Sequence, residues 1–242
     1  MRIAQGRIHW RWAAAGDRGG HRPPIVLVHG LGVSGTYLMP VARELAAAYR
    51  VYVPDLPGSG QSDKPPRVLG VGGLADALRT WMDARRIGRA ILLGQSMGCQ
   101  VAVDLAMRFP ERVERLILVA PTFDPAARSP FTQLFRFGAD AFRESPSLAL
   151  LAAADYLRAG PLRVLRTLHL AMQNHIEGKL PHLRVPTLVV TGSRDPIAPP
   201  AWAKAAAALV PRGQFAVIPG GPHGVNFSRP RELAALVGEF LK

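Results

Sequence analysis

The stretch Gly94-Gln95-Ser96-Met97-Gly98 decides the fold. It follows an apolar segment, residues 90–93, that is typical of a buried strand, and it opens a helical pattern over residues 97–109. A serine on so sharp a strand-to-helix turn exposes its hydroxyl at the carboxyl edge of a sheet, and the flanking glycines let strand and helix approach closely. The helix N-terminus also offers free N–H groups to a developing oxyanion. Ser96 is therefore the predicted nucleophile.

Strands and helices alternate outward from this turn, which predicts an α/β fold with a mostly parallel sheet and helices on both faces. Strands are expected at 25–28, 51–53, 116–119, 187–191 and 215–218, and helices at 34–49, 74–86, 201–209 and 231–241. Residues 122–182 interrupt the rhythm with three helix-like pieces and no good strand candidate. The sequence thus predicts a core of residues 1–121 and 183–242, with 122–182 as an inserted helical cap, or lid.

A serine nucleophile needs a base, and the base needs an orienting acid. His223 lies just after the last predicted core strand, at the end of the sheet where α/β proteins place their sites. Asp195 follows the preceding strand, and the chain order Ser96, Asp195, His223 is the order of this kind of triad. Asp124, which follows the strand at 116–119, is kept as a rival for the acid.

A second glycine-rich loop, His29-Gly30-Leu31-Gly32, follows the strand at 25–28. Such a loop can turn a backbone N–H toward the serine, so the predicted oxyanion hole consists of the N–H groups of Leu31 and Met97. His29 is expected to hold the loop rather than to react. The predicted substrate-binding side chains are Tyr37, soon after this loop, and Phe123 and Phe131 from the cap.

The composition excludes several other classes of protein. The chain has 242 residues, 48% of them hydrophobic, which suits one folded domain. The formal net charge is +13, but the basic residues are scattered and no nucleic-acid motif accompanies them, so no nucleic-acid partner is expected. The apolar stretches fall short of a membrane span, no secretory signal is evident, and Cys99 is the single cysteine, which together predict a cytoplasmic protein. The acids and histidines lack metal-ligand spacing, so no metal is expected.

Five motifs together resemble those of the α/β-hydrolase superfamily, and they cover nearly the whole chain. They are HGLG at 29–32, DLPGSGQS at 55–62, GQSMG at 94–98, GSRDPIAP at 192–199 and PHGVNFSRP at 222–230. The resemblance implies an eight-stranded, mostly parallel sheet, a helical cap after the sixth strand and no cofactor. Haloalkane dehalogenases and epoxide hydrolases of this superfamily carry aspartate at the elbow, so Ser96 disfavours both.

The expected activity is hydrolysis of small to medium carboxylic esters with an apolar acyl part, through an acyl-enzyme on Ser96, as in a carboxylesterase. Carbon–carbon bond hydrolases of the meta-cleavage-product type are similar too, although HGLGVS departs from their more glycine-rich HGGGPG-like loop. Lactonases, thioesterases and cofactor-free haloperoxidases share the constellation and stay open. Outside enzymes, the alternatives are a ligand-binding protein of the hydrolase fold and an interaction protein at an anionic surface. The sequence does not specify the physiological substrate or the oligomeric state.

Overall fold

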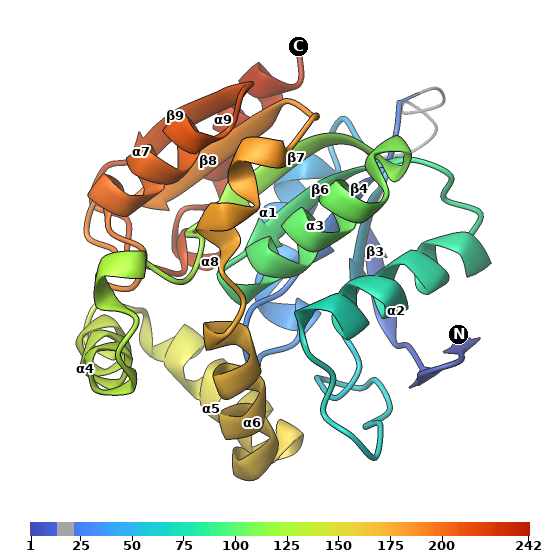
Figure 1. The fold of residues 1–242 in the computed structure, drawn as a ribbon, viewed down its shortest axis with the longest axis horizontal. Coiled ribbons are helices and arrows are strands. Elements are labelled where there is room, and N and C mark those ends of the chain that lie inside the picture. Colours follow the sequence, from blue (N-terminus) through green and yellow to red (C-terminus); the bar gives the residue numbers. More distant parts are fainter. Residues whose placement is uncertain (14–21) are drawn as a thin grey trace.

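The central feature of the molecule is a twisted sheet whose strands run parallel except at one edge (Figure 1). The computed structural model describes residues 1–13 and 22–242. In the described chain the sheet has the strand order β3-β5-β4-β6-β7-β8-β9, and only β3 pairs antiparallel. The strands are β3 (Trp10–Ala13), β4 (Ile25–Val28), β5 (Val51–Pro54), β6 (Ala90–Gln95), β7 (Val113–Val119), β8 (Thr187–Gly192) and β9 (Gly213–Ile218).

The predicted eight-stranded sheet therefore has seven strands in the part of the chain that the structure describes. The two strands that precede β3, β1 (Arg2–Ile3) and β2 (Gly6–Arg7), pair with each other as a separate antiparallel hairpin. Each is only two residues long; the chain reverses between them at Ala4 and Gln5, and Gly6, which begins β2, has a φ of 116°. Neither strand extends far enough to pair with the main sheet.

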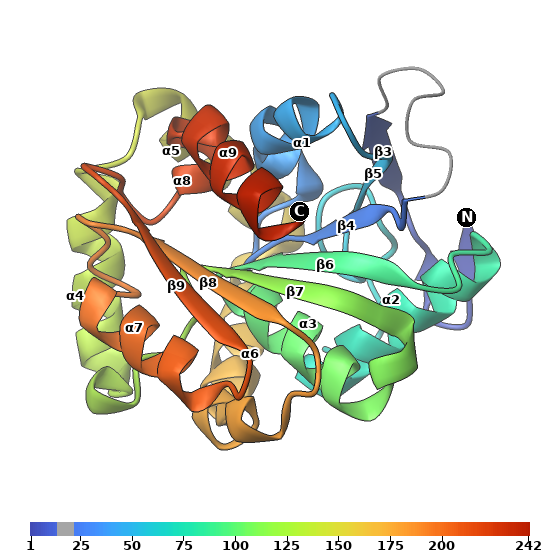
Figure 2. The same cartoon turned by 90° about the horizontal axis from the view of Figure 1, so that it is seen from above.

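Helices cover both faces of the sheet, as the alternating pattern predicts (Figure 2). Helices α1 (Met39–Leu45) and α9 (Pro230–Phe240) lie on one face, and α2 (Val71–Ala84), α3 (Met97–Arg108) and α7 (Pro200–Leu209) lie on the other. The strands β4, β6 and β8 are buried along their whole length, which explains why they are continuous apolar runs. The short helix α8 (Val225–Ser228) precedes α9.

Residues 122–182, here called the helical insertion, connect β7 to β8 and contain α4 (Pro130–Ala141), α5 (Pro146–Ala159) and α6 (Pro161–Met172). Each helix begins with a proline, whose fixed φ and missing N–H suit the first helical turn. Figure 1 shows the three helices grouped at one end of the molecule. The loops that follow β4, β6, β8 and β9 meet the insertion at this end, because carboxyl ends of parallel strands share one edge of a sheet.

Candidate active site

Ser96 lies on a sharp turn between β6 and α3, with φ 56° and ψ −122°. A non-glycine residue in this region of backbone space is strained, and such strain is typical of a nucleophile elbow. The two glycines of the motif allow the turn: a Cβ atom on Gly94 would lie 2.7 Å from the Cys99 nitrogen, and one on Gly98 would lie 2.7 Å from the His29 carbonyl oxygen. Both obstacles are backbone atoms, so a larger residue would push the helix and the neighbouring loop away from the serine.

Asp195 and His223 form a buried pair across the loops after β8 and β9. The Nδ1 atom of His223 lies 2.9 Å from Oδ2 of Asp195, and the two residues are 8% and 3% exposed. The other carboxylate oxygen of Asp195 accepts the N–H groups of Ile197 and Ala198, each at 2.8 Å. These bonds hold the carboxylate in one orientation, which in turn fixes the imidazole with its proton on Nδ1.

The electrostatics of this pair favour a charged imidazolium. Burial raises the pKa of Asp195, but the His223 side chain and the backbone donors outweigh burial, and the net shift is downward. Burial lowers the pKa of His223, but the Asp195 carboxylate outweighs burial, and the net shift is upward. The carboxylate therefore stabilises the positive charge that the imidazole acquires when it takes a proton.

The Nε2 atom of His223 is buried and has no hydrogen-bond partner among the described residues. A neutral imidazole with its proton on Nδ1 presents Nε2 as an acceptor. The bond from Ser96 to His223 that nucleophilic attack requires is not formed in this geometry. Such bonds are often long before substrate binds and shorten in the reacting complex.

Two backbone N–H groups beside Ser96 are free. Leu31 and Met97 are buried, at 9% and 4% exposed, and no acceptor within residues 1–13 and 22–242 takes the N–H of either. Met97 is the first residue of α3, so its N–H has no partner within the helix. Met97 directly follows Ser96, and Gly30, which precedes Leu31, lies close to the serine: a Cβ atom on Gly30 would stand 3.2 Å from Cβ of Ser96. An oxyanion would need donors here.

Tyr37, predicted to contact substrate, is instead a buried tether. Its hydroxyl accepts the N–H of Gly30 at 3.2 Å and donates to Oε1 of Gln95. The side-chain amide of Gln95 in turn donates to the carbonyl of His223 at 3.3 Å. Gln95 thus connects the elbow to the oxyanion loop, through Tyr37, and to the loop of His223. The sequence does not predict this role, because the residue before the serine in the motif can be of any type.

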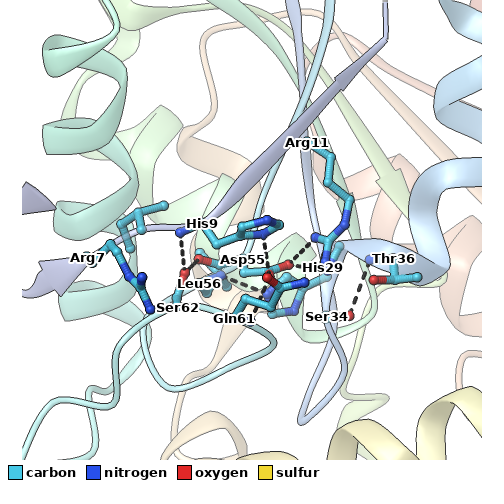
Figure 3. A network of polar contacts seen from close by, with 12 residues as sticks. Arg7, His9, Arg11, His29, Ser34, Thr36, Asp55, Leu56, Gln61 and Ser62 are labelled. Atoms are coloured by element: carbon cyan, nitrogen blue, oxygen red, sulfur yellow. Dashed lines mark hydrogen bonds and ion pairs between the residues drawn. The ribbon is translucent and has the colours of Figure 1, made fainter. Parts of the chain in front are cut away.

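His29 and the loop 55–62 join in a buried polar network (Figure 3). Asp55 is fully buried, and its carboxylate accepts the N–H of Gly35 at 2.7 Å and pairs with Arg11 at 2.7 Å. His29 accepts the N–H of Leu56 at Nε2, and its pKa is lowered by burial, which keeps the ring neutral. The expected structural role of His29 agrees with these contacts, because they hold the oxyanion loop against its neighbour.

Three carboxylates of the helical insertion reach the backbone of the catalytic loops. Asp140 accepts the N–H of His223 at 3.2 Å, and Glu144 accepts the N–H of Gly224 at 2.5 Å. On the other side of the serine, Asp155 accepts the N–H of Ser34 at 2.7 Å. Burial raises the pKa of Asp140, and it raises the pKa of Glu144 to about 7. The insertion is therefore bonded to both the base loop and the oxyanion loop.

The remaining predicted residues lie elsewhere. Asp124 is bonded to Arg136 at 3.0 Å and to the N–H of Ala126 at 3.0 Å, so its carboxylate is engaged within the insertion. Phe123 is 2% exposed and packs in the core. Phe131 is 85% exposed on α4, and its contact with substrate stays a prediction; the helical pattern does not tell which face of α4 turns toward the core.

A narrow cleft, partly open to solvent, begins beside the oxyanion loop and the elbow. Its walls come from those two turns, from loop 56–59, from residues 68–74 and from the α5–α6 corner of the insertion. The lining residues are Gly32, Leu56, Pro57, Gly58, Ser59, Val68, Leu69, Leu74, Met97, Ala159, Arg163, Val164 and Thr167. Tyr37, Phe123 and Phe131 are not among them.

Comparison with known proteins decides the family. The family model described as "Alpha/beta hydrolase family" matches residues 25–236, which is most of the chain. The chain belongs to this family. In the described part of the chain, no group of three or more histidine, cysteine or acidic side chains is arranged to hold a metal, and no helix has both the length and the apolar character needed to cross a bilayer.

Proteins similar to this chain include two that are named as esterases. A pimeloyl-[acyl-carrier protein] methyl ester esterase of Edwardsiella ictaluri is 30% identical over 96% of each chain. A solved esterase from Thermogutta terrifontis superposes with a TM-score of 0.81 at 27% identity, over 97% of this chain and 92% of that one. An uncharacterized protein of Mycobacterium tuberculosis is 41% identical over 101 residues, which are 42% of this chain and 30% of the relative. The chain thus matches less than a third of that relative's length.

Proposed function

We propose that this hydrolase cleaves carboxylic esters through an acyl-enzyme on Ser96. The observation that carries the proposal is the pairing of Asp195 with His223 at 2.9 Å, with a free Nε2 on the same imidazole, at the edge of the sheet that presents a strained serine. Free N–H groups on Leu31 and Met97 supply the oxyanion hole. One such donor is worth about 3–4 kcal/mol of transition-state stabilisation.

The proposed reaction has two steps, acylation of Ser96 and hydrolysis of the acyl-enzyme. The Ser96 oxygen forms a bond to the carbonyl carbon while its proton passes to Nε2 of His223, and the carbonyl electrons move to the oxygen held by Leu31 and Met97. The carbon–oxygen bond to the alcohol then breaks, and the alcohol leaves with the proton from His223. Water repeats the sequence in the second step: it gives a proton to His223, adds to the acyl carbon and releases the acid, and Ser96 regains its proton.

The helical insertion acts as a cap in this proposal, because a lid over the serine would keep bulk water away from the acyl-enzyme. Its bonds to the backbone of Ser34, His223 and Gly224 support that role. The proposed substrates are small to medium esters, since the cleft beside the elbow is narrow and has several apolar side chains among its lining residues. The cytoplasm remains the proposed location, supported by a single, buried cysteine, Cys99.

A series of p-nitrophenyl esters from acetate upward tests the proposal, with Ser96→Ala as control. We expect turnover by the wild type that disappears in Ser96→Ala, with an optimum chain length that sizes the cleft. Equal turnover in Ser96→Ala would refute the role of Ser96. Absence of turnover on every ester would refute the esterase proposal and favour carbon–carbon bond hydrolysis or a ligand-binding role.

A further inference from the structure

The cleft beside the elbow lies on the side of the serine that faces away from the base. It includes Gly32 of the oxyanion loop and Met97 of the elbow, but no residue of the loops that carry Asp195 and His223. During ester cleavage the leaving alcohol must lie next to His223, because it takes its proton from Nε2. The other substituent of the tetrahedral carbon, the acyl chain, then points away from His223 and toward this cleft.

One ionisable side chain, Arg163 in the first turn of α6, lines the cleft among the residues that the structure describes. Its Nη2 donates to the carbonyl of Pro65 at 2.7 Å, which ties it to the loop after Gly58. Its Nη1 lies over Gly58, 3.3 Å from where a Cβ atom would stand, so the glycine leaves room for the guanidinium. No aspartate or glutamate of the described chain forms an ion pair with it within 4.0 Å.

This arrangement leaves Arg163 with unused hydrogen-bonding capacity. A guanidinium carries five N–H donors in a planar fork that matches a carboxylate, and one bond, to Pro65, is accounted for. The rest of the lining is uncharged, with apolar side chains beside Ser59, Thr167 and exposed backbone. A mostly apolar pocket with one placed charge is the usual design of a site that selects a ligand by one end.

Carboxylates lie close to the base, on the other side of the serine. Asp140 accepts the backbone N–H of His223, and Asp195 is bonded to the His223 ring, while Arg143 and Arg194 line a hollow beside Pro222. An anionic group on the leaving alcohol would approach Asp140 and Asp195, whereas an anionic group at the end of the acyl chain would lie beside Arg163 and away from them.

We propose that Arg163 is a specificity residue that binds an anionic group, such as a carboxylate, at the far end of the acyl chain. The preferred substrates are then monoesters of dicarboxylic acids, or esters of similarly charged acyl groups, with a neutral or cationic alcohol. This inference rests on the proposed esterase function and adds the class of acyl group to it.

The test compares p-nitrophenyl monoesters of linear dicarboxylic acids with p-nitrophenyl esters of monocarboxylic acids of the same chain length. The measured quantity is the ratio of kcat/KM for the charged ester to that for the neutral ester. We expect the ratio to exceed one in the wild type and to fall about tenfold or more in Arg163→Gln, since a hydrogen bond to a charged group is worth about 1.5–3 kcal/mol. Arg163→Lys should lie between them, because lysine keeps the charge but not the planar fork.

Arg166→Gln is the matched control. Arg166 lies one turn further along α6, is exposed and does not line the cleft, so its loss changes the net charge equally. The ratio should stay at the wild-type value in this variant. A second measurement needs no variant: linear dicarboxylates should inhibit hydrolysis of a neutral ester by the wild type more strongly than monocarboxylates of equal length.

Each other outcome overturns the proposal. An unchanged ratio in Arg163→Gln, or an equal loss for both esters, would mean that Arg163 only holds the loop at Pro65. Equal inhibition of the wild type by dicarboxylates and monocarboxylates would also refute the binding role of Arg163, and this measurement does not depend on a folded variant. Both results leave the esterase function intact when neutral esters are hydrolysed in a Ser96-dependent way. If the wild type hydrolyses neither ester, the proposed function fails and the role of Arg163 fails with it.

Discussion

Replacing Tyr37 with phenylalanine separates a structural tether from a substrate contact. The substitution removes one hydroxyl, which accepts the N–H of Gly30 and donates to Gln95. Tyr37 is 4% exposed and Gln95 is 2% exposed, so water cannot replace the lost bonds. A buried polar group without a partner costs about 1–3 kcal/mol, and two such groups give a loss of roughly 2–6 kcal/mol in the free energy of unfolding.

Thermal unfolding and steady-state kinetics together measure this effect. For a chain of this size, about 2–4 °C is lost per kcal/mol, so Tm should fall by roughly 4–24 °C in Tyr37→Phe. Gly30 precedes the proposed oxyanion donor Leu31, so loss of the Gly30 bond should displace that donor. We expect kcat to fall about tenfold, which is less than the roughly 10²–10³-fold fall in kcat that follows complete loss of one donor. KM should change little, because Tyr37 does not line the cleft.

Tyr49→Phe is the control, since Tyr49 is only partly buried and its hydroxyl has no hydrogen-bond partner in the described chain. Its Tm and kcat should match those of the wild type. A raised KM in Tyr37→Phe with an unchanged Tm would refute the reasoning. That result would restore Tyr37 as a residue that contacts substrate.

Two further predictions concern the acids around the base. Asp195→Asn should lower kcat by roughly 10⁴-fold, because the imidazole loses its orienting charge, whereas Asp124→Asn should lower Tm with little change in kcat; the reverse result would make Asp124 the catalytic acid. Glu144→Gln keeps an oxygen acceptor for the N–H of Gly224 but removes a negative charge that raises the pKa of His223. The acidic limb of the kcat/KM profile should therefore move to lower pH, and an unmoved limb would show that Glu144 carries no charge near the base.

Much of the site could be predicted from local sequence signals. The turn at Ser96 needs glycines on both sides for steric reasons, and those glycines are visible in the sequence. Asp195 and His223 each follow a recognisable strand, and β8 and β9 are neighbours in the sheet, so their loops must meet. The count of eight strands, which the resemblance implies, exceeds the seven of the described sheet, because β1 and β2 pair with each other in a separate hairpin.

The contacts between the insertion and the core could not be predicted in the same way. Asp155 bonds to Ser34 across 121 positions of sequence, and Asp140 and Glu144 reach their partners across 83 and 80 positions. Which carboxylate meets which backbone N–H depends on how three helices pack on the sheet, and side-chain periodicity alone does not encode that packing. The exposure of Phe131 has the same origin, because an amphipathic pattern does not tell which neighbour covers its apolar side.

The most direct test of the central claim is covalent labelling with an organophosphate that reacts with activated serines, followed by mass spectrometry of the digested protein. We expect one adduct on the peptide that contains Ser96, with labelling lost in His223→Ala because the serine then lacks its base. An adduct on any other residue, or labelling that persists in His223→Ala at the wild-type rate, would contradict the assignment of Ser96 and His223 as nucleophile and base.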